Sequence, residues 1–305
     1  MRRKDCKLLP HIKENLYGLS PDSAQLIGWQ IKEFGIESKW SKSQGENVTI
    51  GVIDTGCDIN HKDIKDNIVQ GINIIDPSKD PIDDNGHGSH VAGTIAASNN
   101  GLGIVGVAPK AKIAPIKALN GNGLGSNTDI AKAIVWAADN KIDIVTMSLG
   151  SEYPSKQIEN AIIYAKSKNL IIFCAAGNSG IESGIQYPAK YENTISVGAI
   201  NRQLDICEFS CCGEELDFVA PGYEIISCIP NNSYAIMSGT SMATPYAVGC
   251  AALLLSYRRN LFSNNDLIDI NSYISVFSKN CQRVNNQKYS GNKKYEGYGI
   301  IRPTF

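Results

Sequence analysis

The sequence predicts an α/β fold, in which a mostly parallel central sheet carries helices on both faces. The first observation is a series of apolar, β-branched runs of strand length, at 48–53, 112–119, 142–147 and 169–175. The second is that these runs alternate with helical stretches, near 87–97, 127–140 and 155–168. Continuous apolar strands separated by helices are typical of a parallel sheet that is buried on both faces.

The second half of the chain continues this pattern. Further strands are expected at about 194–199, 215–219 and 224–228. A helix is expected after Ser241 and another at 264–278. We therefore expect three parts: an N-terminal extension at 1–25, one globular domain at 26–279, and a C-terminal tail at 280–305 that packs on the domain or extends from it.

Composition limits the classes of partner. The chain has 305 residues, of which 43% are hydrophobic, and this is enough for one large core. Its formal net charge of -1 provides no basic field for nucleic acid or for an anionic membrane surface. Because no run of about 18 apolar residues is present, no membrane-spanning helix is expected. We expect neither nucleic acid nor a membrane as a partner.

Three reactive side chains stand at element boundaries. Ser241 precedes the apolar run 246–255, so its hydroxyl is expected at the N-terminus of a buried helix, where the helix dipole favours an oxyanion. Alone, such a serine is most simply a helix cap. Asp54 ends the first apolar run, and His87 stands where a glycine-rich loop becomes a helix. A serine nucleophile needs a base to take its proton and an anion to orient that base, and these residue types provide both.

The blocks around these residues, in the order Asp, His, Ser, resemble the signature blocks of the subtilisin-like serine proteases (subtilases). The resemblance covers about 48–255 and implies the subtilisin-like three-layer fold. It also implies that Ser241 is the nucleophile, His87 its base and Asp54 the anion that orients His87. His90 is the alternative base in the sequence His-Gly-Ser-His. Matching to the family selects His87, and the helix position of His90 predicts that it faces the interior.

The segment 175–178 resembles the Ala-Ala-Gly-Asn block of the family. Alone, a Gly-Asn pair most often marks a turn. The resemblance implies that the amide of Asn178 donates a hydrogen bond to the oxyanion of acyl transfer, with the backbone N–H of Ser241 as the second donor.

Subtilases bind an extended peptide as an added strand between two edge segments. The segments that match here are Gly123, Leu124 and Gly125 on one side and Ser148, Leu149 and Gly150 on the other. The first of these is alternatively a flexible surface loop. The specificity pocket is expected between the second segment and a wall made of Ala175, Ala176 and Gly177. Gln186 is expected to narrow its floor.

The residue at the rim of this pocket predicts the preferred substrate. Ser179 stands where some relatives carry a glutamate, so no carboxylate attracts a basic side chain there. We therefore expect a preference for apolar or uncharged residues before the scissile bond.

The glycine-punctuated stretch 98–109 follows the expected His87 helix and resembles the calcium loop of the family. Ca²⁺ takes six to eight oxygen ligands, including backbone carbonyls. The resemblance implies five ligand residues: Asp63, Ser98, Asn100, Leu102 and Ile104. A plain turn without an ion is the alternative. The sequence does not locate the N-terminal ligand that relatives supply.

The N-terminal extension contains a segment with a known counterpart. Residues 8–11, Leu-Leu-Pro-His, resemble the Leu-Ile-Pro-Tyr-like motif of the bacterial intracellular subtilisins, with histidine in place of tyrosine. In those proteins the motif lies across the active site, which implies an inhibitory extension. A cut between about Glu14 and Leu26 would then activate the enzyme. A disordered tail is the alternative.

Cysteine usage predicts a reducing compartment. The chain has nine cysteines, an odd number, and no apolar signal-peptide region follows its basic start. Both observations favour the cytoplasm over a disulfide-forming compartment. The cluster Cys207, Cys211 and Cys212 lacks the paired spacing of a zinc site, so no zinc is expected there.

The sequence thus predicts a cytoplasmic, calcium-stabilised serine endopeptidase for protein turnover or processing, with extended polypeptides as substrates and no organic cofactor. The resemblance also allows a homodimer. A protease that trims one precursor is a narrower alternative. A pseudoprotease used as a binding module is the alternative outside catalysis, and the presence of all four catalytic residue types argues against it.

Overall fold

The structure, a computed structural model, describes residues 5–15, 22–261 and 269–305. Within these residues the central sheet has the strand order β11-β10-β9-β7-β3-β5-β4, and every neighbouring pair is parallel. Its members are β3 (Thr49–Asp54), β4 (Ile72–Asn73), β5 (Lys112–Lys117), β7 (Ile144–Met147), β9 (Ile171–Ala175), β10 (Ile195–Ile200) and β11 (Phe218–Pro221). The predicted fold class is confirmed.

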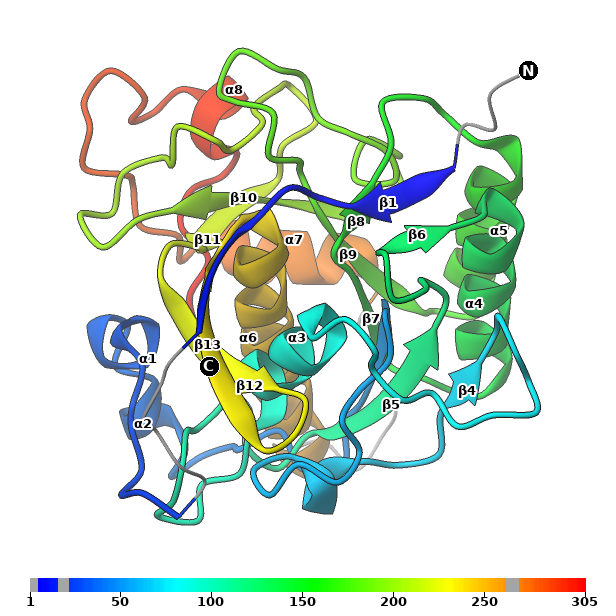
Figure 1. Ribbon diagram of the computed structural model, residues 1–305. Coiled ribbons are helices and arrows are strands. Elements are labelled where there is room, and N and C mark those ends of the chain that lie inside the picture. The colour runs from blue at the N-terminus through cyan, green and yellow to red at the C-terminus, as the bar shows by residue number, and fades with distance from the viewer. Residues whose placement is uncertain (1–4, 16–21, 262–268) are drawn as a thin grey trace.

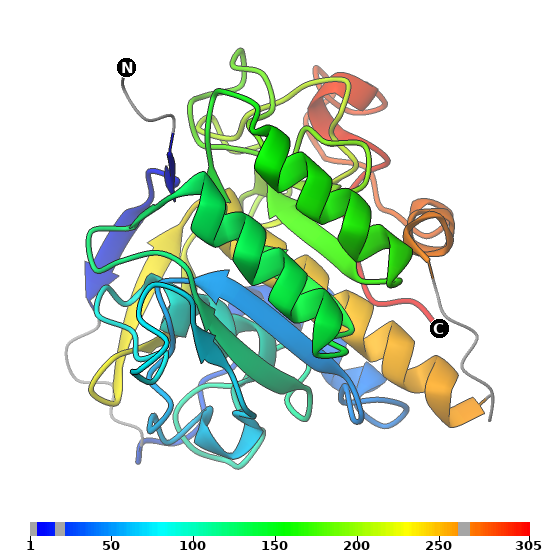
Figure 2. The same cartoon turned by 90° about the vertical axis from the view of Figure 1, so that its right-hand side faces the viewer.

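Helices cover both faces of this sheet. They are α4 (Asn127–Asp139) and α5 (Lys156–Ser167) on one face, and α3 (His87–Ala96) and α6 (Thr240–Leu261) on the other (Figure 2). Successive residues of a strand point to opposite faces, so each strand contributes to two apolar cores. Val52 of β3 belongs to the core under α3 and α6, and Ile53 belongs to the core under α4 and α5.

Two small antiparallel sheets flank the central one. The first joins β6 (Leu124–Gly125), β1 (Cys6–Leu8) and β8 (Leu149–Gly150), with β1 in the middle (Figure 1). The second joins β12 (Ile225–Ile229), β13 (Ser233–Ser238) and β2 (Ile12–Asn15). The expected strand at 224–228 therefore belongs to a hairpin outside the central sheet. Both small sheets contain a strand from the N-terminal extension.

Short helices complete the described structure: α1 (Trp29–Glu33), α2 (Ile36–Lys39), η1 (Lys65–Asn67), α7 (Ile270–Ser278) and α8 (Lys293–Glu296). The helix expected at 264–278 is present from Ile270, and its first part lies outside the described residues. The last segment of the chain returns to the core, because Ile300 is buried and bridges to Val219 of β11. None of the helices in the described ranges is long and apolar enough to cross a bilayer.

Candidate active site

Asp54 and His87 form a buried pair at the carboxyl edge of the central sheet. Asp54 is the last residue of β3, and His87 is the first residue of α3. Nδ1 of His87 lies 2.9 and 3.0 Å from the two carboxylate oxygens of Asp54, and both side chains are almost fully buried. A carboxylate only accepts hydrogen bonds, so Nδ1 must carry the proton. Nε2 of His87 therefore carries the lone pair of the ring. Among the described residues, Nε2 has no hydrogen-bond partner.

The position of Ser241 is fixed by a proline one turn later. Pro245 lies inside α6 and has no N–H to donate to the carbonyl of Ser241. The hydroxyl of Ser148, at the start of the predicted substrate edge, donates to that carbonyl instead, at 3.0 Å. In return, Oγ of Ser241 donates to the carbonyl of Ser148 at 3.3 Å. The serine hydroxyl is thus paired with the substrate edge and not with His87.

His90 lies in the interior, as its helix position predicts. Its Nε2 donates to the carbonyls of Ile225 and Ala235, at 3.0 and 3.2 Å, and so links α3 to the β12–β13 hairpin. Burial, reinforced by the nearby His87, lowers the pKa of His90 to about 3. A histidine held neutral and enclosed in this way has no path to a substrate, which leaves His87 as the candidate base.

Asn178 follows β9 with its amide oriented by α6. Its Oδ1 accepts hydrogen bonds from the backbone N–H and the hydroxyl of Thr240, at 2.9 and 2.8 Å. Only the Nδ2 end is left to face the cleft. There it donates to the carbonyl of Pro10 at 2.7 Å. The candidate oxyanion donor is therefore aimed at a backbone carbonyl, and that carbonyl belongs to the N-terminal extension.

The two predicted substrate edges hold the extension itself. Lys7 of β1 pairs with Leu124 on one side and Gly150 on the other, and the N–H of Leu8 donates to the carbonyl of Gly123 at 2.8 Å. The glycines permit this approach. A Cβ on Gly123 would lie 2.8 Å from Leu8, and one on Gly150 would lie 2.6 Å from Cδ2 of Leu9.

Leu9 occupies the predicted specificity pocket and is only 1% exposed. The pocket wall is apolar, since Ala175 and Ala176 are fully buried. Two further side chains bound the pocket, because a Cβ on Gly177 would meet Sγ of Cys211 at 2.8 Å and Cγ of Gln186 at 3.0 Å. The sequence pointed to Gln186. It gave no sign of Cys211, which lies 34 residues further along the chain from Gly177, in a Cys-Cys pair without a motif.

Beyond Leu9 the extension passes over His87. The imidazole of His11 lies 5.0 Å from that of His87, centroid to centroid, and its Nδ1 donates to the carbonyl of Leu9 at 3.1 Å. Burial and the neighbouring His87 lower the pKa of His11. Strand β2 then pairs with β13, the strand that precedes Ser241. Residues 6–15 thus run between the two predicted substrate edges, past His87 and along β13.

The chain is similar in sequence to known proteases along most of its length. A model of the subtilase family matches residues 45–299. The chain belongs to the subtilase family. It is 41% identical over 261 residues to the intracellular serine protease of Paenibacillus polymyxa. These residues make up 83% of this chain and 80% of the relative. The chain is 40% identical over 242 residues to the major intracellular serine protease of Bacillus subtilis, 76% of each chain.

A third relative is longer than this subtilase. The thermophilic serine proteinase of Bacillus sp. (strain AK1) is 44% identical over 223 residues, 72% of this chain, but the chain spans only 55% of that relative's length. The family and these relatives identify the protein as a subtilisin-like serine protease, and hence a hydrolase.

Three backbone carbonyl oxygens of the predicted calcium loop surround the side-chain amide of Gln25. Nε2 of Gln25 lies 2.9 Å from the carbonyl oxygen of Ser98 and 3.2 Å from those of Leu102 and Ile104. Asp63 packs on the same loop, with its Oδ2 accepting the N–H of Ile104 at 2.8 Å. Its Oδ1 is buried without a hydrogen-bond partner in the described structure.

This arrangement fits a calcium ion, because several oxygens gather around one point and a buried carboxylate oxygen lacks a partner. Gln25 is a candidate for the N-terminal calcium ligand that the sequence did not locate. Exchanging the positions of its amide nitrogen and oxygen would add Oε1 to the candidate ligand oxygens. The side chain of Asn100 is engaged in the loop itself, since its Oδ1 accepts the N–H of Leu102 at 3.0 Å. The sequence did not indicate Gln25 as a ligand, because a single glutamine outside any motif is an ordinary polar residue.

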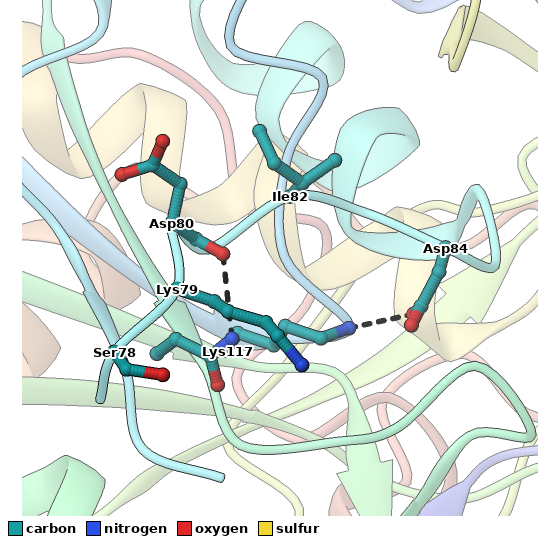
Figure 3. Close-up of a pocket in the computed structure, with 7 residues that line it drawn as sticks. Ser78, Lys79, Asp80, Ile82, Asp84 and Lys117 are labelled. Carbon is teal, nitrogen blue, oxygen red and sulfur yellow. Dashed lines mark hydrogen bonds and ion pairs between the residues drawn. The ribbon is translucent and has the colours of Figure 1, made fainter. Parts of the chain in front are cut away.

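A pocket of about 530 Å³ lies between Lys117 and the loop that joins β4 to α3 (Figure 3). Nζ of Lys117, at the end of β5, donates there to Oδ1 of Asp84 at 2.6 Å and to the carbonyl of Thr55. Thr55 directly follows Asp54. The lysine therefore holds the backbone next to the Asp54 carboxylate, and its charge is paired with Asp84.

The burial of His90 predicts that the protein loses stability in acid. Because its pKa is lowered from 6.5 to about 3, the unfolded chain binds a proton between these pH values that the folded chain does not. The free energy of unfolding should therefore fall as the pH drops below about 6.5, by about 1.4 kcal/mol per unit from this group. Urea unfolding of Ser241→Ala from pH 7 to 4.5 gives the reference slope, and adding His90→Asn should reduce it by about one proton. Equal slopes in the two proteins would show that His90 is not held neutral.

Proposed function

We propose that this subtilase is a serine endopeptidase in which Asp54, His87 and Ser241 act as a catalytic triad. The observation that carries the proposal is the buried Asp54–His87 pair, which fixes the proton on Nδ1 and leaves Nε2 as a base. His87 takes the proton of Ser241 as its Oγ attacks the peptide carbonyl. The resulting oxyanion accepts hydrogen bonds from Nδ2 of Asn178 and the N–H of Ser241. His87 then protonates the leaving amine, and water releases the acyl group by the same route.

A fluorophosphonate probe tests this assignment, because it reacts only with an activated serine. With residues 1–15 deleted to open the cleft, we expect one adduct by intact-mass spectrometry. Ser241→Ala in the same background should give none, and Asp54→Asn should slow labelling by at least a hundredfold, since the wrong tautomer of His87 is then favoured. Heat-denatured protein serves as the control for non-specific reaction. An adduct of undiminished yield on Ser241→Ala would refute the proposal.

We further propose that residues 6–15 inhibit the enzyme by occupying its cleft. Strand β1 lies in the middle of the sheet that the substrate is expected to complete, and Leu9 lies in the pocket. The carbonyl that meets Asn178 belongs to Pro10, whereas the carbonyl of Leu9 is held by His11. Leu9 lies in the pocket, but its carbonyl, which belongs to the peptide bond that would be cut, does not face the oxyanion donor Asn178. This mismatch explains how the extension can bind like a substrate without being cut.

The same contacts indicate what the enzyme cleaves and where an activating cut can fall. An apolar pocket that takes Leu9 supports cleavage after leucine and similar apolar residues. Gln25 and Ala24 are bound to the calcium loop, through Ser98 and Leu102 among others. We therefore narrow the expected cut to the part of the Glu14–Leu26 range that precedes Ala24. Residues 16–21 of that range lie outside the described structure.

Removing the pocket contact should activate the full-length enzyme. Burial of a leucine side chain is worth about 1.5–3 kcal/mol, so Leu9→Asp should raise the initial rate on a small peptide roughly tenfold or more. Lys7→Ala is the matched control, because Lys7 lies in the same strand with its side chain exposed and should leave the rate unchanged. Intact mass before the assay verifies that no variant has been trimmed. An equally slow Leu9→Asp protein that keeps its fold would exclude inhibition by this segment.

We propose that Ca²⁺ binds between Asp63 and the 98–104 loop and stabilises the fold. Bound ligand at 100 times its Kd stabilises a protein by about 2.7 kcal/mol, or a melting-temperature shift of roughly 5 °C or more. EDTA should therefore lower the melting temperature of Ser241→Ala by that amount. Gln25→Ala should lose most of the response, and Gln203→Ala, an exposed glutamine elsewhere, should keep it. A melting temperature that is the same in EDTA and in calcium would rule out the site.

We propose a cytoplasmic location. Two of the relatives are named intracellular proteases, and all nine cysteines are unpaired. Eight of the nine are also buried, where they act as small apolar side chains.

A further inference from the structure

A buried carboxylate, that of Asp83, lies in the loop that precedes α3 and accepts five hydrogen bonds. Its Oδ1 accepts from the hydroxyl of Thr55 at 2.8 Å and from the backbone N–H groups of Asn85 and Gly86 at 3.0 and 2.9 Å. Its Oδ2 accepts from the N–H and the hydroxyl of Ser89, at 2.9 and 2.6 Å. Because Asp83 is only 5% exposed, these protein donors take the place of water around the carboxylate.

These bonds replace a helix cap that α3 lacks. The N-cap position is Gly86, which has no side chain and a φ of 107°. The N–H groups in the first turn of a helix need acceptors from outside the helix. Asp83 accepts from the N–H groups of Gly86 and Ser89, and its negative charge complements the positive end of the helix dipole. The direction in which α3 begins is therefore set by this carboxylate.

The same carboxylate connects the first turn of α3 to the strand that carries Asp54. Thr55 directly follows Asp54 at the end of β3. While its hydroxyl donates to Asp83, it accepts the N–H of Gly88 at 3.0 Å. The two segments are in direct contact, since a Cβ on Gly88 would lie 2.1 Å from a carbonyl oxygen of the turn after β3. The backbone on each side of His87 is thus attached, through Asp83 and Thr55, to the end of β3.

We propose that Asp83 is a positioning residue, which holds the imidazole of His87 in line with Asp54. None of the five hydrogen bonds of Asp83 involves the imidazole itself, so the effect is transmitted by the backbone. Displacing a catalytic group by about 1 Å costs on the order of a hundredfold in rate. The inference rests on the proposed role of His87 as the base of Ser241.

An asparagine in place of Asp83 keeps the shape of the side chain but not its acceptors. One of the two carboxylate oxygens becomes an NH₂ group, which only donates. Whichever way this amide is turned, the NH₂ group faces backbone N–H groups, either those of Asn85 and Gly86 or that of Ser89. The first turn of α3 must then move away from the loop, and the imidazole of His87 moves with it.

Proton NMR of full-length Ser241→Ala measures this geometry without any need for proteolysis. The Nδ1 proton of a histidine that donates to a buried carboxylate resonates far downfield of the amide protons. We expect one such signal, and His87→Gln should remove it. Asp83→Asn should abolish or displace the signal in a protein that remains folded by near-ultraviolet circular dichroism. Asp80→Asn is the matched control, because it changes an exposed carboxylate of the same loop and should leave the signal in place.

Kinetics on a peptide substrate test the consequence for catalysis. In full-length Leu9→Asp protein with Ser241 intact, adding Asp83→Asn should lower kcat roughly a hundredfold. KM should stay within about twofold, because the hydrogen bonds of Asp83 do not reach the substrate edges and uniform binding of the peptide is unchanged. Asp80→Asn in the same background should change neither constant.

Thr55→Val is a second test variant in case Asp83→Asn does not fold, since it removes the hydroxyl between Asp83 and Gly88. It should displace the NMR signal, and Thr55→Ser, which keeps a hydroxyl, should restore it. Folded Asp83→Asn and Thr55→Val proteins that keep the parent signal and the parent kcat would overturn this inference alone. A parent protein without a downfield signal that depends on His87 would overturn the proposed Asp54–His87 pair, and this inference with it.

Discussion

The buried carboxylate of Asp54 is the feature on which the surrounding structure depends. It is fully enclosed at the end of β3, where an unsatisfied charge would be costly. His87 and the N–H of Thr55 donate to it directly. Thr55 is then held from three sides. Its hydroxyl donates to Asp83 and accepts the N–H of Gly88, and its carbonyl accepts from Lys117. The loop before α3 is therefore ordered by the same network that fixes the tautomer of His87.

The sequence predicted the parts of this arrangement that rest on local patterns. Long apolar runs such as 169–175 can only be buried strands or helices, and their length and neighbours distinguish the two. Asp54 was placed correctly at the end of a strand for the same reason, and Asn178 comes three residues after the run 169–175. The family resemblance then assigned them their proposed roles.

Elements whose stability comes from distant contacts could not be predicted in this way. Strand β1 is only three residues long, Cys-Lys-Leu, and has no periodic pattern. It is a strand because β6 and β8 supply partners on both sides. Gln25 is likewise an ordinary polar residue in the sequence, and only the fold brings the carbonyls of the 98–104 loop around its amide.

The exchange of hydrogen bonds between Ser148 and Ser241 has a mechanical consequence. Pro245 frees the carbonyl of Ser241, and the hydroxyl of Ser148, at the proposed substrate edge, donates to that carbonyl. The proposed nucleophile and the proposed docking edge are thereby linked by two hydrogen bonds, although 93 residues separate them in the chain. If peptides dock here as proposed, a chain that pushed this edge outward would also move the serine relative to His87. Selection among peptides would then act through the position of the serine hydroxyl as well as through binding strength.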